Sequence, residues 1–309
     1  MNQRNIISLA YANQELDIVP SLGAAIARYQ VIHQGKAYDF LRRASKGAID
    51  QGVISEMASF LMAPWAGRIQ NGTFNYQGKD IHYPSSIPNF PHSMHGFTRD
   101  KAWHIVEQTA QMALLAFNHS ENHDWPFSFE LFQRVELTDT GVTISVTVQN
   151  IGDTDMPFSL GHHPFFPCNE HTLIKTNVQR AWYSDDELMP IVLNTHPACQ
   201  KLAQGLYVQE QGFDTIFTDW DKKVEIYWLD ERRYLRYHVT EPMDFFVLYN
   251  PPGEQWFCAE PFGNITNSFN LREKFPQETI GGMDIKAGEK IETRFELVPG
   301  FELQSPLGS

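Results

Sequence analysis

The sequence predicts an all-β protein, a large antiparallel β-sandwich (a β-supersandwich) with few or no helices. Strand-like segments, in which apolar and polar residues alternate, recur through almost the whole 309-residue chain. Turn sequences such as Asn71-Gly72 and Pro299-Gly300 separate these segments. Helical periodicity is scarce, and the mixed pattern of residues 48–62 fits either a short helix or a loop. We therefore expect about 15–20 strands in two packed sheets.

The clearest pair of strands lies in the middle of the chain. Residues 127–137 alternate between apolar and polar, the turn 138–141 follows, and residues 142–148 alternate again, which is typical of a hairpin. Further strands are expected at residues 224–229, 234–239, 245–249, 256–259 and 293–297.

We expect one domain, residues 1–303, followed by a flexible C-terminal tail at 304–309. No linker rich in glycine, serine or proline divides the chain. A sheet of this width curls, and its concave face can collect polar side chains around a ligand.

Charge and cysteines narrow the class of partner. The net charge is −13 and is spread along the chain, which disfavours nucleic acid and anionic membranes. The three cysteines, without a C-x-x-C motif, argue against a disulfide framework or a thiolate zinc site and suit a reducing compartment. No apolar run is long enough for a signal peptide or a membrane span, so a cytoplasmic location is expected.

The segment 161–166, Gly-His-His-Pro-Phe-Phe, is the most informative motif. We expect its histidines at the end of a strand, where Pro164 and the aromatic residues would hold them rigidly for proton exchange near neutral pH. The alternative is a loop histidine that only bonds the backbone.

Three further segments carry candidate binding residues. Arg68, in Pro-Trp-Ala-Gly-Arg-Ile, could grip paired hydroxyls or a carboxylate, or simply form a surface ion pair. His95 precedes Gly96, which indicates a tight turn or a close backbone approach. With His92 it forms H-x-x-H, but the flanking prolines and the missing third ligand argue against a metal. Asp214, at the expected start of a strand, could cap a turn or hold sugar hydroxyls.

Glu260 follows an apolar strand and precedes Pro261. A carboxylate among apolar side chains tends to have a raised pKa and can then act as a base near pH 7, although a strand-end ion pair is the simpler alternative. Together with His163, His95 and Arg68, this carboxylate fits acid–base chemistry on a neutral polar substrate. No nucleophile elbow, phosphate loop or dinucleotide fingerprint is present.

With these motifs the chain resembles the aldose 1-epimerase (galactose mutarotase) family, in its bacterial branch. The resemblance runs in order from about Leu22 to Pro299. It is carried by residues 64–69, 72–74 and Gly78, by 94–97 and Trp103, by 125–127, Pro157 and 161–166, by Phe213-Asp214, and by 259–261 with 267–270.

The resemblance implies a β-supersandwich that interconverts the α and β anomers of a hexose without a cofactor or a metal. Glu260 would be the base and His163 the acid, while Arg68, His95 and Asp214 would bind substrate. The partner would be a small-molecule sugar, a free hexose or a hexose phosphate, and the protein a monomer or homodimer.

Two departures from the family pattern stand out. Gly67 occupies a position where many members carry asparagine, and His162 beside His163 offers a second candidate acid. We prefer His163 because it directly precedes Pro164.

Three alternative functions stay open at this point. A hexose-6-phosphate 1-epimerase would need added cations such as Arg99 or Lys101. A non-catalytic sugar-binding protein on the same fold would not need the acid and the base. A glycoside hydrolase would need Glu260 and Asp214 as opposed carboxylates.

Overall fold

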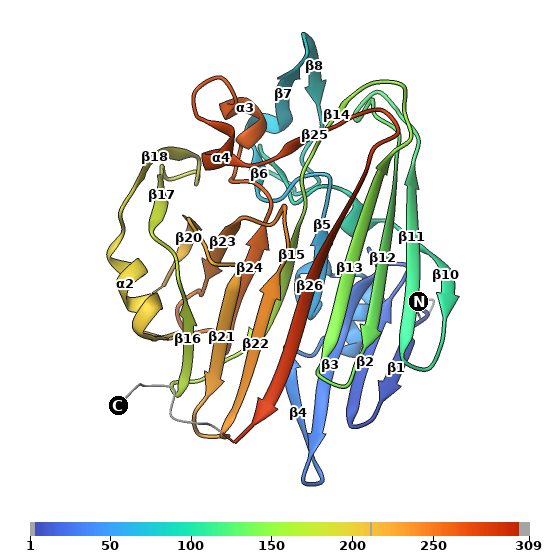
Figure 1. Cartoon of the computed structure of the whole chain (residues 1–309). Coiled ribbons are helices and arrows are strands. Elements are labelled where there is room, and N and C mark those ends of the chain that lie inside the picture. The colour runs from blue at the N-terminus through green and yellow to red at the C-terminus, as the bar shows by residue number, and fades with distance from the viewer. Residues whose placement is uncertain (1–3, 211, 303–309) are drawn as a thin grey trace.

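The computed structural model describes residues 4–210 and 212–302, and these form a sandwich of two large antiparallel sheets (Figure 1). The eleven-stranded sheet has the order β1 (Ile7–Tyr11), β2 (Gln14–Val19), β3 (Ala25–His33), β5 (Ser59–Met62), β15 (Gly161–Pro167), β24 (Trp256–Phe262), β23 (Phe245–Tyr249), β20 (Asp214–Thr218), β17 (Arg180–Ser184) and β18 (Pro190–Asn194), with β4 (Lys36–Leu41) paired to β3. The all-β prediction is confirmed.

The nine-stranded sheet has the order β10 (His104–Gln108), β11 (Met112–His119), β12 (Phe129–Leu137), β13 (Val142–Asn150), β26 (Lys290–Phe301), β22 (Arg233–Val239), β21 (Lys223–Trp228), β16 (Thr172–Thr176) and β19 (Leu206–Tyr207). Three two-stranded ribbons lie outside the large sheets: β6 (Arg68–Ile69) with β9 (Ser93–Met94), β7 (Thr73–Tyr76) with β8 (Lys79–His82), and β14 (Met156–Phe158) with β25 (Met283–Ile285). Because of these ribbons, the described residues hold more strands than we expected.

Helices in the described residues are few and short, as the sequence predicts. They are α1 (Lys46–Gln51), α2 (Pro197–Gln204), α3 (Ser268–Leu271) and α4 (Gln277–Ile280), with 3₁₀ turns at Ile54–Glu56, Gln70–Gly72 and Thr98–Asp100. Among the described residues, no helix has the length and apolar character needed to span a membrane.

The predicted hairpin is present as β12 and β13, which pair from Phe129 with Asn150 to Leu137 with Val142. One face of each strand is buried and the other half-buried, so the polar residues alternate with apolar ones. The five later strands are also confirmed as β21, β22, β23, β24 and β26, and β23 has the predicted bounds while those of the others differ by one to several residues.

Two expectations about the centre of the sheet are wrong. Residues 48–62 contain a helix and a 3₁₀ turn, but also the central strand β5, which is buried on both faces and therefore shows no alternation. His162 and His163 are not at the end of a strand or in a loop, because they lie inside β15 between β5 and β24. Glu260 likewise lies within β24, which continues to Phe262.

Apolar side chains form two buried clusters. The larger one fills the space between the sheets and includes Leu61 and Ala259 from one sheet and Leu131 and Leu297 from the other. The smaller one includes Phe60, Met62, Phe165, Cys258 and Phe262, whose strand neighbours belong to the larger cluster. Since side chains alternate along a strand, the smaller cluster lies on the outer face of the eleven-stranded sheet.

The predicted tail at 304–309 lies outside the described residues. None of the three cysteines is in a disulfide.

Candidate active site

The register of two central strands brings His163 and Glu260 together. β15 and β24 pair Gly161 with Phe262 and Phe165 with Cys258, so His163 lies opposite Glu260 in the interval between these pairs. Each strand has a proline in this interval, Pro164 and Pro261, which cannot donate a backbone hydrogen bond. On its other edge β15 pairs with β5, where His163 faces Phe60. The chemistry therefore depends on two segments about 100 residues apart in sequence that are neighbours in one sheet.

Alternation along β15 separates the two histidines. His162 is buried against the ring of Phe295 on β26, 5.0 Å between centroids, and so points into the core between the sheets. The His163 ring contacts the rings of Phe60 and Phe165, at 4.7 and 4.6 Å between centroids, on the outer face. Only His163 of the two lines the cavity described below.

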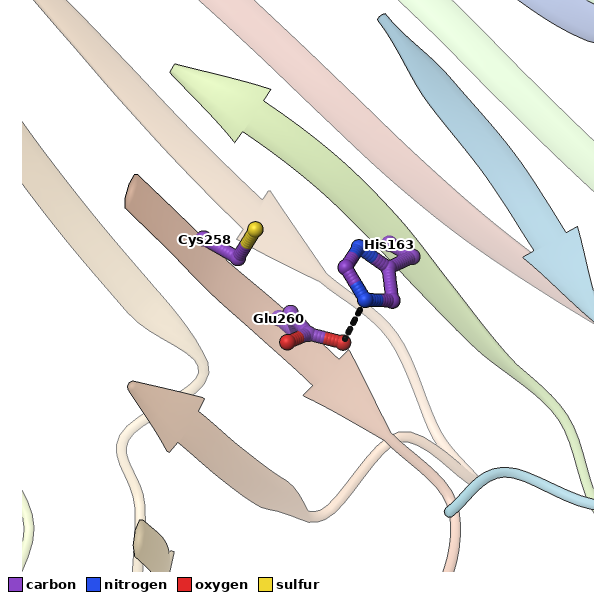
Figure 2. Close-up of side chains that lie close together, drawn as sticks. All are labelled: His163, Cys258 and Glu260. Carbon is purple, nitrogen blue, oxygen red and sulfur yellow. Dashed lines mark ion pairs between the residues drawn. The ribbon is translucent and has the colours of Figure 1, made fainter. Parts of the chain in front are cut away.

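The His163 and Glu260 side chains face each other, with Nε2 and Oε2 3.5 Å apart (Figure 2). Burial, reinforced by the charge of Asp214, raises the pKa of the Glu260 carboxyl well above its usual range. Burial also lowers the pKa of His163 to about 3, with added contributions from Arg99 and Arg42. Desolvation therefore favours the uncharged form of both groups.

His95 reaches the same place from a turn. Its backbone adopts a left-handed conformation (φ 60°), and its N–H donates to the Gly67 carbonyl oxygen. The Gly67 N–H in turn donates to Nδ1 of His95 at 3.2 Å, which leaves the ring proton on Nε2. Burial lowers the pKa of His95 well below its usual value, so the ring is neutral and can donate through Nε2–H.

The turn after His95 requires glycine, as the sequence indicates. Gly96 has φ +65°, and a Cβ built there would lie 1.9 Å from the carbonyl oxygen of Ala63. The close backbone approach fixes the His95 ring, whose centroid is 5.3 Å from that of His163.

Arg68 and Asp214 line the same cavity. Arg68 begins β6, and its buried Nε has no hydrogen-bond partner among the described residues. Asp214 begins β20, as predicted, and pairs with Tyr249. Desolvation raises the pKa of the Asp214 carboxyl, while the Arg68 charge opposes that shift.

All five residues predicted for the site line one cavity of about 640 Å³. Its volume is in the range of small-molecule sites. Aromatic rings, those of Phe60, Phe165, Tyr249 and Trp256, form much of the wall. Lys101, which we considered as a phosphate ligand, is not among the described residues that line it.

Two lining arginines add charge to the cavity. Arg99 was noted in the sequence only as a candidate cation, and Arg42 was missed. Arg42 follows β4 and is surrounded by no motif, so only the folded sheet reveals its place. The aromatic residues Phe60 and Trp256 were missed as well, because nothing in the sequence tells an aromatic strand residue that faces a ligand from one in the core.

One group of side chains has the spacing to hold a metal ion. The ligand atoms of His163, Cys258 and Glu260 all lie within 4.8 Å of one another, and all three residues are buried (Figure 2). A thiolate, an imidazole and a carboxylate suit Zn²⁺. His92, the other candidate, instead accepts a hydrogen bond from the Asn71 N–H and does not join His95.

Comparison with known proteins shows what the whole chain is similar to. The family model described as Aldose 1-epimerase matches residues 5–297. The chain is 22% identical to the protein YphB of Escherichia coli (strain K12) over 235 residues, which are 72% of this chain and 78% of YphB.

Solved structures with the same fold cover nearly the whole chain. A galactose mutarotase-like protein from Clostridium acetobutylicum superposes with a TM-score of 0.87 at 19% identity, covering 96% of each chain. A GalM/aldose epimerase homologue from C. elegans superposes with a TM-score of 0.81 at 15% identity, covering 97% of this chain and 100% of that one. At such identities the likeness shows the fold alone.

Proposed function

The chain belongs to the aldose 1-epimerase family, and from this membership we propose that it interconverts the α and β anomers of an aldohexose. Glu260 takes the proton of the anomeric hydroxyl while His163 gives a proton to the ring oxygen, and the C1–O5 bond breaks. Rotation about C1–C2 presents the other face of the aldehyde. Closure returns the proton from Glu260 to O1, and His163 takes the proton from O5.

The observation that carries this proposal is the approach of His163 Nε2 to Glu260 Oε2, 3.5 Å apart in one cavity. Ring opening needs the proton on His163, and ring closure needs it on Glu260. Since each group is buried beside the other, moving the proton between them leaves the net charge of the site unchanged. The pair is therefore suited to a reaction that runs equally in both directions.

The other polar groups suit a polyhydroxylated ligand. His95 offers a fixed Nε2–H donor, Arg68 an unpaired guanidinium, and Asp214 a carboxylate acceptor. We assign hydroxyl binding to these three, and stacking against the sugar to the aromatic wall. The acid role belongs to His163, because His162 packs in the core between the sheets.

The test is polarimetry on freshly dissolved α-D-glucose and α-D-galactose. The wild type should accelerate relaxation to the anomeric equilibrium. Glu260→Gln and His163→Asn should each lower the rate about 10²–10⁴-fold, since each removes one proton-transfer group. Circular dichroism checks that both variants are folded.

The chain offers a matched control. His238 and Glu296 form an exposed His–Glu pair, 3.4 Å apart, on the nine-stranded sheet. His238→Asn and Glu296→Gln make the same chemical changes away from the cavity and should leave the rate unchanged. A folded Glu260→Gln or His163→Asn enzyme with the wild-type rate would refute the role assigned to that residue.

A further inference from the structure

The cavity contains a buried cation that the described residues do not neutralise. The Arg99 side chain is 8% exposed and lines the cavity. Its Nε has no hydrogen-bond partner among the described residues. Its nearest acid is the half-exposed Asp100, at 3.6 Å, which is beyond hydrogen-bond distance. Burying a guanidinium whose Nε–H has no acceptor is costly. The position of Arg99 next to an open cavity therefore points to a ligand that supplies the acceptor.

A second cation lies against another ring of the same aromatic cluster. The Arg42 guanidinium lies 3.9 Å from the ring centroid of Phe165, and that of Arg99 lies 5.6 Å from the centroid of Phe60. Both rings contact the His163 ring. Arg42 donates to the carbonyl oxygens of Ser55 and Met57, which hold it in place without cancelling its charge.

The acids of the cavity do not pair with two of its cations. Among the described residues, no acidic side chain forms an ion pair with Arg42 or Arg68. The acids that line the cavity are Glu56, Asp214 and Glu260, and the first two are exposed, so solvent screens their charge. Arginines without an acidic partner can therefore attract an anion to this place.

The position of the two cations tells which part of a sugar would carry the charge. Each lies against a ring that contacts His163, Arg42 against Phe165 and Arg99 against Phe60. In the proposed reaction His163 exchanges a proton with the ring oxygen. In a pyranose, the carbon next to that oxygen on the non-anomeric side is C5, and its substituent is C6.

We propose that the substrate of this site is an aldohexose with an anionic group at C6, bound by Arg99 and assisted by Arg42. The inference depends on the proposed function, because His163 gives the sugar its orientation. A carboxylate, a phosphate ester and a sulfonate share the needed chemistry. Arg99 has its guanidinium N–H groups free to make paired, charge-assisted hydrogen bonds to any of them.

The experiment compares charged and neutral sugars at anomeric equilibrium, where NMR exchange spectroscopy measures interconversion without isolated anomers. D-galacturonate and D-glucose 6-phosphate provide a carboxylate and a phosphate, and D-galactose and D-glucose are their neutral counterparts. For the wild type, kcat/KM should be at least about 10-fold higher for one of the anionic sugars than for its counterpart. The preferred anion identifies the C6 group.

Arg99→Met removes the charge and keeps the length of the side chain. It should lower the ratio of kcat/KM, anionic over neutral, by about 10- to 100-fold, mainly through KM for the anionic sugar. Arg99→Lys should give an intermediate ratio, since it keeps the charge but loses the planar guanidinium that can donate two parallel hydrogen bonds. Arg294→Met is the control, because Arg294 is exposed and pairs only with Glu292; its ratio should equal that of the wild type.

The outcomes separate this inference from the function on which it depends. If no sugar is accelerated, the proposed function fails. If neutral sugars are turned over as well as anionic ones, or if Arg99→Met leaves the ratio unchanged, the epimerase stands and the anionic substrate is refuted. A loss of thermal stability in Arg99→Met would also count against it, because removing an uncompensated buried charge should raise Tm.

Discussion

His163 and Glu260 acquire complementary properties from the same burial. Desolvation disfavours the charged form of both, which makes one a weak base and the other a weak acid. Neither residue alone would be unusual. Their mutual approach converts two desolvated groups into a proton donor and a proton acceptor.

Gly67 shows how one residue can reshape the site wall. Its φ is +71°, a conformation that asparagine also tolerates. A Cβ at Gly67 would, however, lie 2.8 Å from Oγ1 of Thr266, which lines the cavity. Glycine here therefore goes together with a threonine on the facing segment.

Zn²⁺ should inhibit the enzyme by occupying His163, Cys258 and Glu260. The three ligand atoms are close enough for one ion, and two of the residues are those proposed for proton transfer. Micromolar Zn²⁺ should slow mutarotation reversibly, and EDTA alone should have no effect on the rate.

The variant Cys258→Ala separates this inhibition from a general effect of metal. It removes the thiolate ligand and should weaken inhibition by at least about 10-fold. Even changes to residues that only support the ligands of a metal alter its affinity by that order. Equal inhibition of Cys258→Ala and wild type would show that Zn²⁺ binds elsewhere.

At the scale of the element, β15 and β24 contradict a common rule. Proline is usually confined to edge strands, yet Pro164 and Pro261 lie in two adjacent central strands. Both fall in the interval where the β15–β24 ladder lacks pairs, so no ladder hydrogen bond is lost. The interval is also where His163 and Glu260 meet.

The turn at Gly96 is the element most sensitive to a single methyl group. Gly96→Ala should destabilise the fold by about 3–5 kcal/mol, because the added Cβ meets a backbone oxygen that cannot move aside. Gly78→Ala is the matched control: its φ is also positive (+80°), but no atom lies within 4 Å of the new Cβ, so the cost should be about 1–2 kcal/mol.

Urea denaturation followed by circular dichroism measures both free energies of unfolding. Equal losses for the two variants would show that backbone strain alone, and not the contact with Ala63, sets the requirement for glycine.

Alternation predicted β12 and β13, each of which has one partly exposed face, whereas β23 and β24 were predicted although both of their faces are buried. In β12 and β13 the alternation is complete, whereas β5 and β15 are buried on both faces and carry no periodic signal. The motifs around Arg68, His95, His163, Asp214 and Glu260 were visible because each combines a polar residue with glycine, proline or aromatic neighbours. The position of Arg42 and Arg99 at the cavity depends on tertiary packing, which no local sequence pattern encodes.

At the scale of the whole molecule, the two buried clusters have different tasks. The larger one holds the sheets together, and the smaller one supports the cavity from the outer face of the eleven-stranded sheet. Buried histidines connect the two: His162 lies in the first, while His163 and His95 lie at the cavity.

These histidines should make the protein sensitive to acid. Burial lowers the pKa of His162 and His163 to about 3 and that of His95 well below 6.5. As the pH falls below about 6.5, the unfolded chain therefore binds more protons than the native one, and stability declines until about pH 3. The raised pKa values of Glu260 and Asp214 act in the opposite direction, but these are two groups and the histidines are three.

Thermal denaturation between pH 7 and pH 4 measures this effect, and Tm should fall over that range. His162→Leu replaces one of the three by an apolar side chain and should make the dependence on pH visibly shallower. A Tm that stays constant or rises on acidification would contradict the assignment of neutral buried histidines.

The site lies on the outer face of one sheet and not between the two sheets. The residues that contact a ligand are therefore different from those that hold the sheets together. A residue such as Arg99 or Thr266 can be exchanged without repacking the side chains that hold the sheets together. Sugar preference can therefore diverge rapidly among relatives while their architecture remains superposable, and a shared scaffold is a poor guide to the metabolite each one encounters.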